Sequence, residues 1–274
     1  MRRAALLSML VFGGACAGAG IRFPFSSLHA HAVHRFFPDL EQRENAVRYA
    51  RWNALESAWR HGVTPDRDRA LAAEFRESIR RLPDFPPDPR LCAPRVARDL
   101  PGIFGALVAA ERFEGDVADA LAASDATPET SASRVERALA RYRRSRFALA
   151  SPPPRELDAR LGEYATARML LEGDWLFAHA AEDLAGSTWR DQRWRVRATV
   201  DRYDRDIETP PASLEASWYR SFAPTFTKAY EPATELIDRA TRFRIEVFAA
   251  LGAPDPAARR TGADAVARRY GLSR

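Results

Sequence analysis

Histidines gather near the amino end of the chain, and their spacing is suited to metal binding. Three of the five histidines, His29, His31 and His34, lie within six residues. Imidazole nitrogen is a ligand for zinc, copper, nickel and haem iron. On a helix His31 and His34 would share roughly one face, whereas in an extended segment His29 and His31 would do so. The cluster predicts a transition-metal or haem site, with solvated or packed histidines as the alternative interpretation.

A second set of polar side chains falls on one face of a helix predicted over residues 155–185. Glu172, His179 and Asp183 are separated by seven and four residues, which keeps them within a narrow arc at about 100° per residue. Such a stripe could align a general base with an orienting carboxylate, or supply metal ligands inside a bundle. The alternative is a solvated or salt-bridged polar face.

Tryptophan and arginine occur together, most densely in residues 189–195. An Arg guanidinium stacks favourably on an indole ring, and both side chains concentrate binding energy at protein interfaces. If exposed, Trp189, Arg193, Trp194 and Trp218 would form a surface that binds a protein partner. If buried, the tryptophans would be ordinary core residues.

The sequence lacks the motifs of several large enzyme classes. It contains no glycine-rich dinucleotide fingerprint, Walker A sequence, G-x-S-x-G, H-E-x-x-H or C-x-x-C. These absences weigh against nucleotide hydrolases, serine hydrolases, zinc proteases and c-type cytochromes. They leave enzyme activity of another kind open, and the sequence assigns no catalytic or cofactor-binding residue.

The charges are nearly balanced and interleaved along the chain. There are 42 basic and 37 acidic residues, and Lys228 is the only lysine among the basic ones. A nucleic-acid-binding protein concentrates its basic residues on one face. Nucleic acid is therefore not expected as a partner.

Helical periodicity dominates the chain. Hydrophobic residues make up 46% of it, as in globular proteins, and no run of alternating β-branched residues suggests a strand. Apolar residues at helical spacing predict helices over residues 39–61, 66–82 and 134–149, among others. We expect an all-α fold, an antiparallel bundle of roughly seven to nine helices with proline-rich connections. Residues 20–274 would form one helical domain, or two subdomains divided near 83–94 or 124–133.

The amino-terminal residues have the layout of a secretory signal peptide. Arg2 and Arg3 precede an apolar run from Ala4 to Phe12, and small residues follow. This order of regions predicts that residues 1–19 are a signal peptide and that the protein is exported to the periplasm or cell envelope. An uncleaved membrane anchor and lipidation at Cys16 are the alternatives, and both would attach the chain to a membrane.

Together these features predict an exported, helical scaffold or accessory subunit of the cell envelope. It would bind a protein partner or a larger envelope assembly. The alternative prediction is a helical metal- or haem-binding protein, with redox activity as one form of it.

Overall fold

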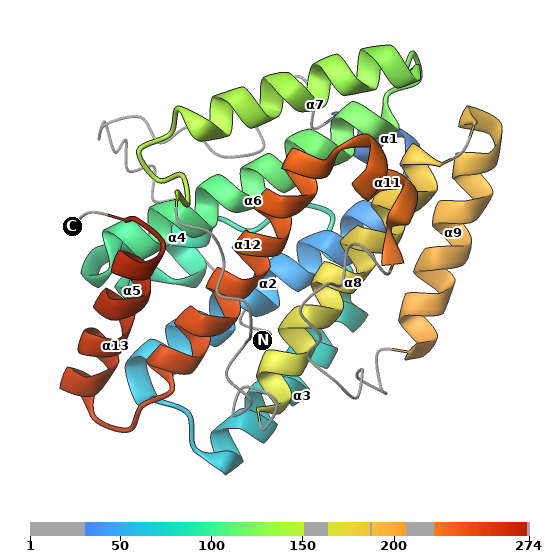
Figure 1. Ribbon diagram of the computed structural model, residues 1–274. Helices are drawn as coiled ribbons and strands as arrows, with labels where there is room; N and C mark the ends of the chain where they lie inside the picture. The colour runs from blue at the N-terminus through green and yellow to red at the C-terminus, as the bar shows by residue number, and fades with distance from the viewer. Residues whose placement is uncertain (1–30, 151–163, 187, 207–221, 273–274) are drawn as a thin grey trace, which may run out of the picture.

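The computed structural model describes residues 31–150, 164–186, 188–206 and 222–272, and these residues form an all-helical fold (Figure 1). No residue in these ranges lies in a strand, which confirms the all-α prediction. In chain order the helices are α1 (His31–Phe36), α2 (Pro38–His61), α3 (Pro65–Arg81), α4 (Pro89–Cys92), α5 (Pro94–Asp99), α6 (Pro101–Ala122), α7 (Pro128–Arg143), α8 (Ala165–Ala185), α9 (Trp189–Asp206), α11 (Pro224–Ala229), α12 (Glu231–Leu251) and α13 (Pro256–Arg269).

Proline occupies the first turn of most of these helices. A proline there loses no hydrogen bond, because the first N–H groups of a helix have no partner within it, and its fixed φ suits the first turn. Several prolines expected in connections therefore begin helices instead. The segment 83–94 contains α4 and the start of α5, and the segment 124–133 contains the first turns of α7.

Several helix N-termini are capped by a carboxylate from another helix. The helices α5, α8 and α11 have no capping side chain of their own. Their first N–H groups donate instead to carboxylates 39 to 98 residues away in the sequence. These long-range caps provide acceptors for N–H groups that have no partner within their own helix, and they connect neighbouring helices. They are Glu56 of α2 on α5, Asp68 of α3 on α8, and Glu182 of α8 on α11, while Asp119 of α6 accepts from Val33 of α1.

A single apolar cluster extends through the described residues from Val33 to Leu272. Its largest fully buried side chains include Trp52 of α2, Phe75 of α3 and Phe243 of α12. Burying a side chain of this size contributes about 1.5–3 kcal/mol. Gly173 allows α8 to lie close to α2, since a Cβ atom there would clash with Val47. This close approach brings Asp174, the next residue of α8, beside Arg51 of α2.

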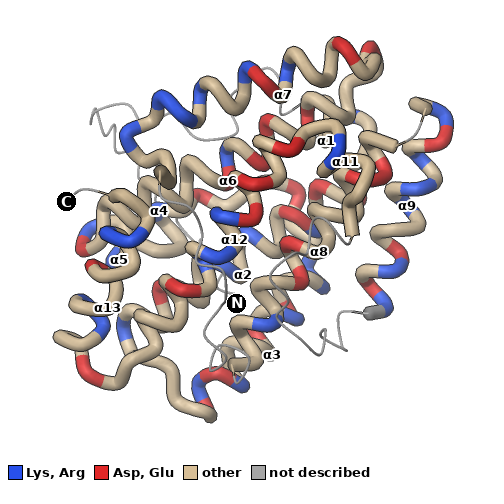
Figure 2. Tube along the Cα trace, viewed as in Figure 1, with Lys and Arg blue, Asp and Glu red and all other residues tan. Residues whose placement is uncertain are grey.

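Charged residues of both signs occur on all the long helices, including those in the centre of the view (Figure 2). Some of them are buried, as on α2, α6 and α12. Within the described ranges, no helix combines the length and the apolar content needed to cross a bilayer.

Candidate functional site

The helix α9 exposes a basic and aromatic surface. Arg190, Arg193, Trp194 and Arg197 are exposed, and Arg193 and Trp194 each lie three or four residues from Arg190 and from Arg197, so the four share one side of the helix. We call these four residues the α9 face. The Trp194 side chain is 60% exposed. The guanidinium carbon of Arg195 lies 5.5 Å from the centre of the Trp194 ring, a distance suited to a cation–π interaction.

The opposite side of α9 holds the helix on the body of the molecule. Val196, Val200 and Tyr203 are buried there. The Thr199 hydroxyl donates to Asp183 of α8 at 2.7 Å, and Arg43 of α2 forms a 2.6 Å ion pair with Asp204. These contacts fix α9, so its outer face is presented on a rigid element.

The predicted partner-binding residues have different environments. Arg193 and Trp194 are exposed, as a docking surface requires. Trp189 is half-buried, and its ring lies 4.7 Å from Phe36 and 5.9 Å from Phe37, measured between ring centres. It anchors the start of α9 to the amino-terminal helices. Trp218 lies outside the described residues.

Only part of the histidine cluster falls within the described structure. His29 lies outside the described residues, and His31 is described only by its place at the start of α1. His34 is exposed, and its Nδ1 atom lies 2.5 Å from Oε2 of Glu41. Among the described residues, no group of three or more His, Cys, Asp or Glu side chains is placed to hold a metal ion.

The polar stripe on α8 lies against the protein interior. Glu172 is 5% exposed, and neither of its carboxyl oxygens has a hydrogen-bond partner in the described part of the chain. Burial raises the pKa of this carboxyl to about 8, although Arg76 opposes the shift. A carboxyl with this pKa is mostly neutral at pH 7, so it can remain buried without a hydrogen bond from the described residues.

His179 and Asp183 complete the stripe, each in its own environment. The His179 ring lies 4.1 Å from the Trp175 ring and 5.3 Å from the Phe222 ring, between ring centres. Its buried Nε2 atom has no hydrogen-bond partner among the residues that the structure describes. Burial, aided by Arg202, lowers the pKa of His179 to about 4. Burial also raises the pKa of Asp183, while its bond from Thr199 lowers it. The stripe therefore combines a neutral acid with a neutral imidazole.

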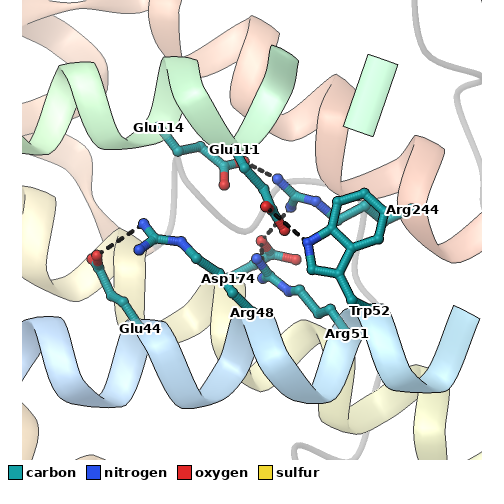
Figure 3. A network of polar contacts seen from close by, with 8 residues as sticks. All are labelled: Glu44, Arg48, Arg51, Trp52, Glu111, Glu114, Asp174 and Arg244. Atoms are coloured by element: carbon teal, nitrogen blue, oxygen red, sulfur yellow. Dashed lines mark hydrogen bonds and ion pairs between the residues drawn. The ribbon is translucent and has the colours of Figure 1, made fainter. Parts of the chain in front are cut away.

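A buried network of ion pairs joins four helices, and the sequence alone did not reveal it (Figure 3). Arg244 of α12 donates to Asp174 of α8 at 2.7 Å and to Glu114 of α6. Arg51 of α2 reaches the same oxygen of Asp174 at 2.7 Å. Burial alone would lower the pKa of Arg244, but Glu114 and Asp174 raise it above its ordinary value. This guanidinium is therefore charged at every physiological pH.

The network continues along α2 and α6. The indole of Trp52 donates to Glu111 at 3.1 Å, and Arg48 forms a 3.1 Å ion pair with Glu44. Burial raises the pKa of both Glu44 and Glu111. All the members of the network drawn in Figure 3 are buried, so its arrangement holds helices together and offers no charge to an outside ligand.

Two features of the sequence could have revealed this network. Glu44, Arg48 and Arg51 follow a helical spacing on one face, and Glu111 and Glu114 interrupt the apolar residues of α6. The spacing shows that charges face inward together. It does not show which helix supplies the partner, because the paired residues are 70 to 130 positions apart.

Comparisons with protein-family models, with curated proteins and with solved structures gave no match. A fold alone does not define an activity, so the chemistry of the exposed α9 face is the guide to function.

Proposed function

We propose that this protein is an exported helical scaffold or accessory subunit of the cell envelope that binds an acidic segment of a protein partner through the α9 face. The observation that carries the proposal is Trp194, a large indole that is 60% exposed with Arg195 beside it. Exposed aromatic and Arg side chains of this kind are the residues that dominate protein–protein binding energy.

Charge complementarity supports an acidic partner. Within the first turns of α9, Arg190, Arg193, Arg195 and Arg197 are all exposed, whereas Asp191 is the acidic residue there. Guanidinium groups pair with carboxylates in a bidentate geometry, and such surfaces steer association in a salt-dependent way. Binding through this face should therefore weaken as the ionic strength rises.

We also propose that the long helices form an antiparallel bundle with the short helices as connections. Eight of the described helices have 14 or more residues, and four have six or fewer. The axes of the long helices α2, α6, α8 and α12 are roughly aligned with one another in Figure 1. Short connections favour antiparallel neighbours.

Site-specific photo-crosslinking in the native host tests the proposed docking surface. A photoreactive amino acid at position 194 should give a discrete crosslinked species, and the same probe in place of exposed Arg143 on α7 should not. Arg193→Glu should reduce the crosslink at position 194, because it reverses one charge on the α9 face. Equal crosslinking at both positions, or no effect of Arg193→Glu, would contradict the proposal.

The export part of the proposal rests on residues 1–19, which lie outside the described residues. The mature chain should begin between Cys16 and Gly20, or carry a lipid on Cys16. Intact-mass measurement of the protein isolated from the native host distinguishes these outcomes. A chain that retains Met1 would contradict cleavage.

A metal- or haem-binding protein is the second candidate. One observation favours it: the bond between His34 and Glu41 resembles the carboxylate contacts that orient metal-binding imidazoles. Replacing His29, His31 and His34 together with Ala should then abolish bound metal or haem in the native protein. Unchanged metal content would remove this candidate.

A further inference from the structure

A cavity of about 360 Å³ lies between α6 and α7, and it shares no lining residue with the α9 face. Its walls are largely apolar, which is the usual character of a small-molecule site. Both helices and the turn after α7 contribute to it. Its lining includes the aromatic side chains of Phe104, Phe113, Tyr142 and Phe147 and the guanidinium groups of Arg112 and Arg144.

Three arginines surround this apolar space. Arg141 is paired, because it donates to Asp116 at 2.9 Å. Arg112 and Arg144 also line the cavity, and within the described part of the chain their side chains form no ion pair or hydrogen bond. Both are exposed, so their guanidinium groups can meet a ligand that enters from solvent. The cavity therefore combines apolar walls with two cations that have no counterion among the described residues.

Gly105 shapes one wall of the cavity. A Cβ atom at this position would lie 2.5 Å from the nearest atom of the Phe147 ring. The absence of a side chain lets Phe147 pack directly on the α6 backbone. The turn after α7 is thereby held against α6, with Arg144 at the edge of the cavity.

We propose that this cavity binds an amphipathic monocarboxylate of about the size of decanoate. The volume of about 360 Å³ has room for roughly a dozen non-hydrogen atoms, taking about 30 Å³ for each as for water in the liquid. A hydrocarbon chain would occupy the apolar walls, and the carboxylate would meet Arg112 and Arg144, whose planar guanidinium groups match its geometry.

The charge of the lining favours an anionic ligand over a neutral one. Arg112, Arg141 and Arg144 contribute three positive charges, and Asp116 already neutralises one of them. The surplus of two positive charges therefore lies on Arg112 and Arg144, and it attracts a carboxylate but not an uncharged alcohol of the same length.

Titration calorimetry on the full chain with decanoate and with decanol as probes tests the proposal. Decanoate should bind with a 1:1 stoichiometry, and decanol should bind at least about tenfold more weakly, because it lacks the charge. The double substitution Arg112→Gln and Arg144→Gln should weaken decanoate binding roughly 10- to 100-fold and leave decanol binding unchanged. Arg143→Gln is the matched control, since Arg143 is exposed next to Arg144 and does not line the cavity.

A second variant tests the location of the hydrocarbon chain. Ala109 lines the cavity and is only partly buried, so Ala109→Phe should fill the space and weaken both probes. The proposal would be overturned by three results: no saturable binding of decanoate, equal binding of decanoate and decanol, or equal decanoate affinity in the double variant and the Arg143→Gln control.

Discussion

Arg244 is the shared counterion of two buried carboxylates, Asp174 and Glu114. Removing it would take the ion-pair partner from Glu114 and leave Asp174 paired with Arg51, in a medium where charges are poorly solvated. We expect Arg244→Met to lower the free energy of unfolding by about 3–5 kcal/mol, measured by urea denaturation. Adding Glu114→Gln to this variant should recover part of the loss, because one uncompensated charge is removed.

The control for this prediction is Arg143→Met. Arg143 is the exposed last residue of α7, and its replacement should change the free energy of unfolding by less than about 0.5 kcal/mol. A loss below about 1 kcal/mol in Arg244→Met would show that the ion pairs contribute little to the folded state. Such a result would be explained by neutralisation of the carboxyl groups rather than by a persistent charged network.

Glu172 makes the stability depend on pH in the opposite direction from a salt-bridged acid. Its pKa rises from the ordinary 4.5 to about 8 in the folded protein because of burial. Between these pH values the folded chain keeps a proton that the unfolded chain releases, so stability falls as the pH rises. We expect Glu172→Gln to abolish this decline and to be more stable than the unsubstituted protein at pH 9, by roughly 3–5 kcal/mol.

Denaturant melts between pH 5 and pH 9 measure this effect. Glu74→Gln on the exposed side of α3 is the matched control, and its stability should follow that of the unsubstituted protein across the same range. If Glu172→Gln and Glu74→Gln gave the same pH profile, the carboxyl of Glu172 would have to be ionised and solvated in the folded state.

At the level of the helices, caps supplied by other helices join several of the elements, beside the apolar cluster and the ion pairs. Glu182 accepts from the N–H groups of Thr225 at 2.8 Å and of Phe226 at 3.0 Å, and α11 has no capping side chain of its own. We expect Glu182→Ala to destabilise the protein by about 1–2 kcal/mol. It should also speed hydrogen exchange at these two amides.

The comparison for that measurement is Glu136→Ala on the exposed side of α7, where no such bond is lost. Faster exchange restricted to α11 in the Glu182→Ala variant is the expected pattern. Unchanged exchange at Thr225 and Phe226 would mean that another group satisfies the start of α11.

The sequence predicted helices well where the apolar periodicity was uninterrupted and where residues next to the helix ends determined those ends. The helix expected over 39–61 is observed as Pro38–His61, and the one expected over 66–82 as Pro65–Arg81. The helix expected over 134–149 instead spans Pro128–Arg143, because Thr127 and Thr130 form a capping box that starts it within the polar segment. Prolines were interpreted as breaks, although most of the prolines in the described ranges lie in the first turns of helices, which is why the structure has more short helices than expected.

The exposure of a site residue could be predicted from the sequence only where it depends on the position of that residue on its own helix. Apolar spacing along α9 is enough to expose Arg193 and Trp194 on one side. The half-buried position of Trp189 depends on Phe36 and Phe37, and the neutral state of Glu172 depends on what other helices pack over it. Such contacts join residues far apart in the chain, so periodicity cannot supply them.

For the whole molecule, the question is whether the segments 83–94 and 124–133 divide it into subdomains. The buried network crosses both segments, since α2 lies before the first, α6 lies between them, and α8 and α12 lie after the second. The apolar cluster also extends across both. Helices that share one core and one ion-pair network should lose their structure together.

We therefore expect the protein to unfold in one thermal transition, with equal calorimetric and van't Hoff enthalpies. Arg244→Met should move this whole transition to lower temperature, because Arg244 joins α12 to both α6 and α8. The exposed control Arg143→Met should leave it in place. Two resolved transitions, of which Arg244→Met moved only one, would instead establish two subdomains. The ion pairs would then stabilise one part of the chain rather than the junction between parts.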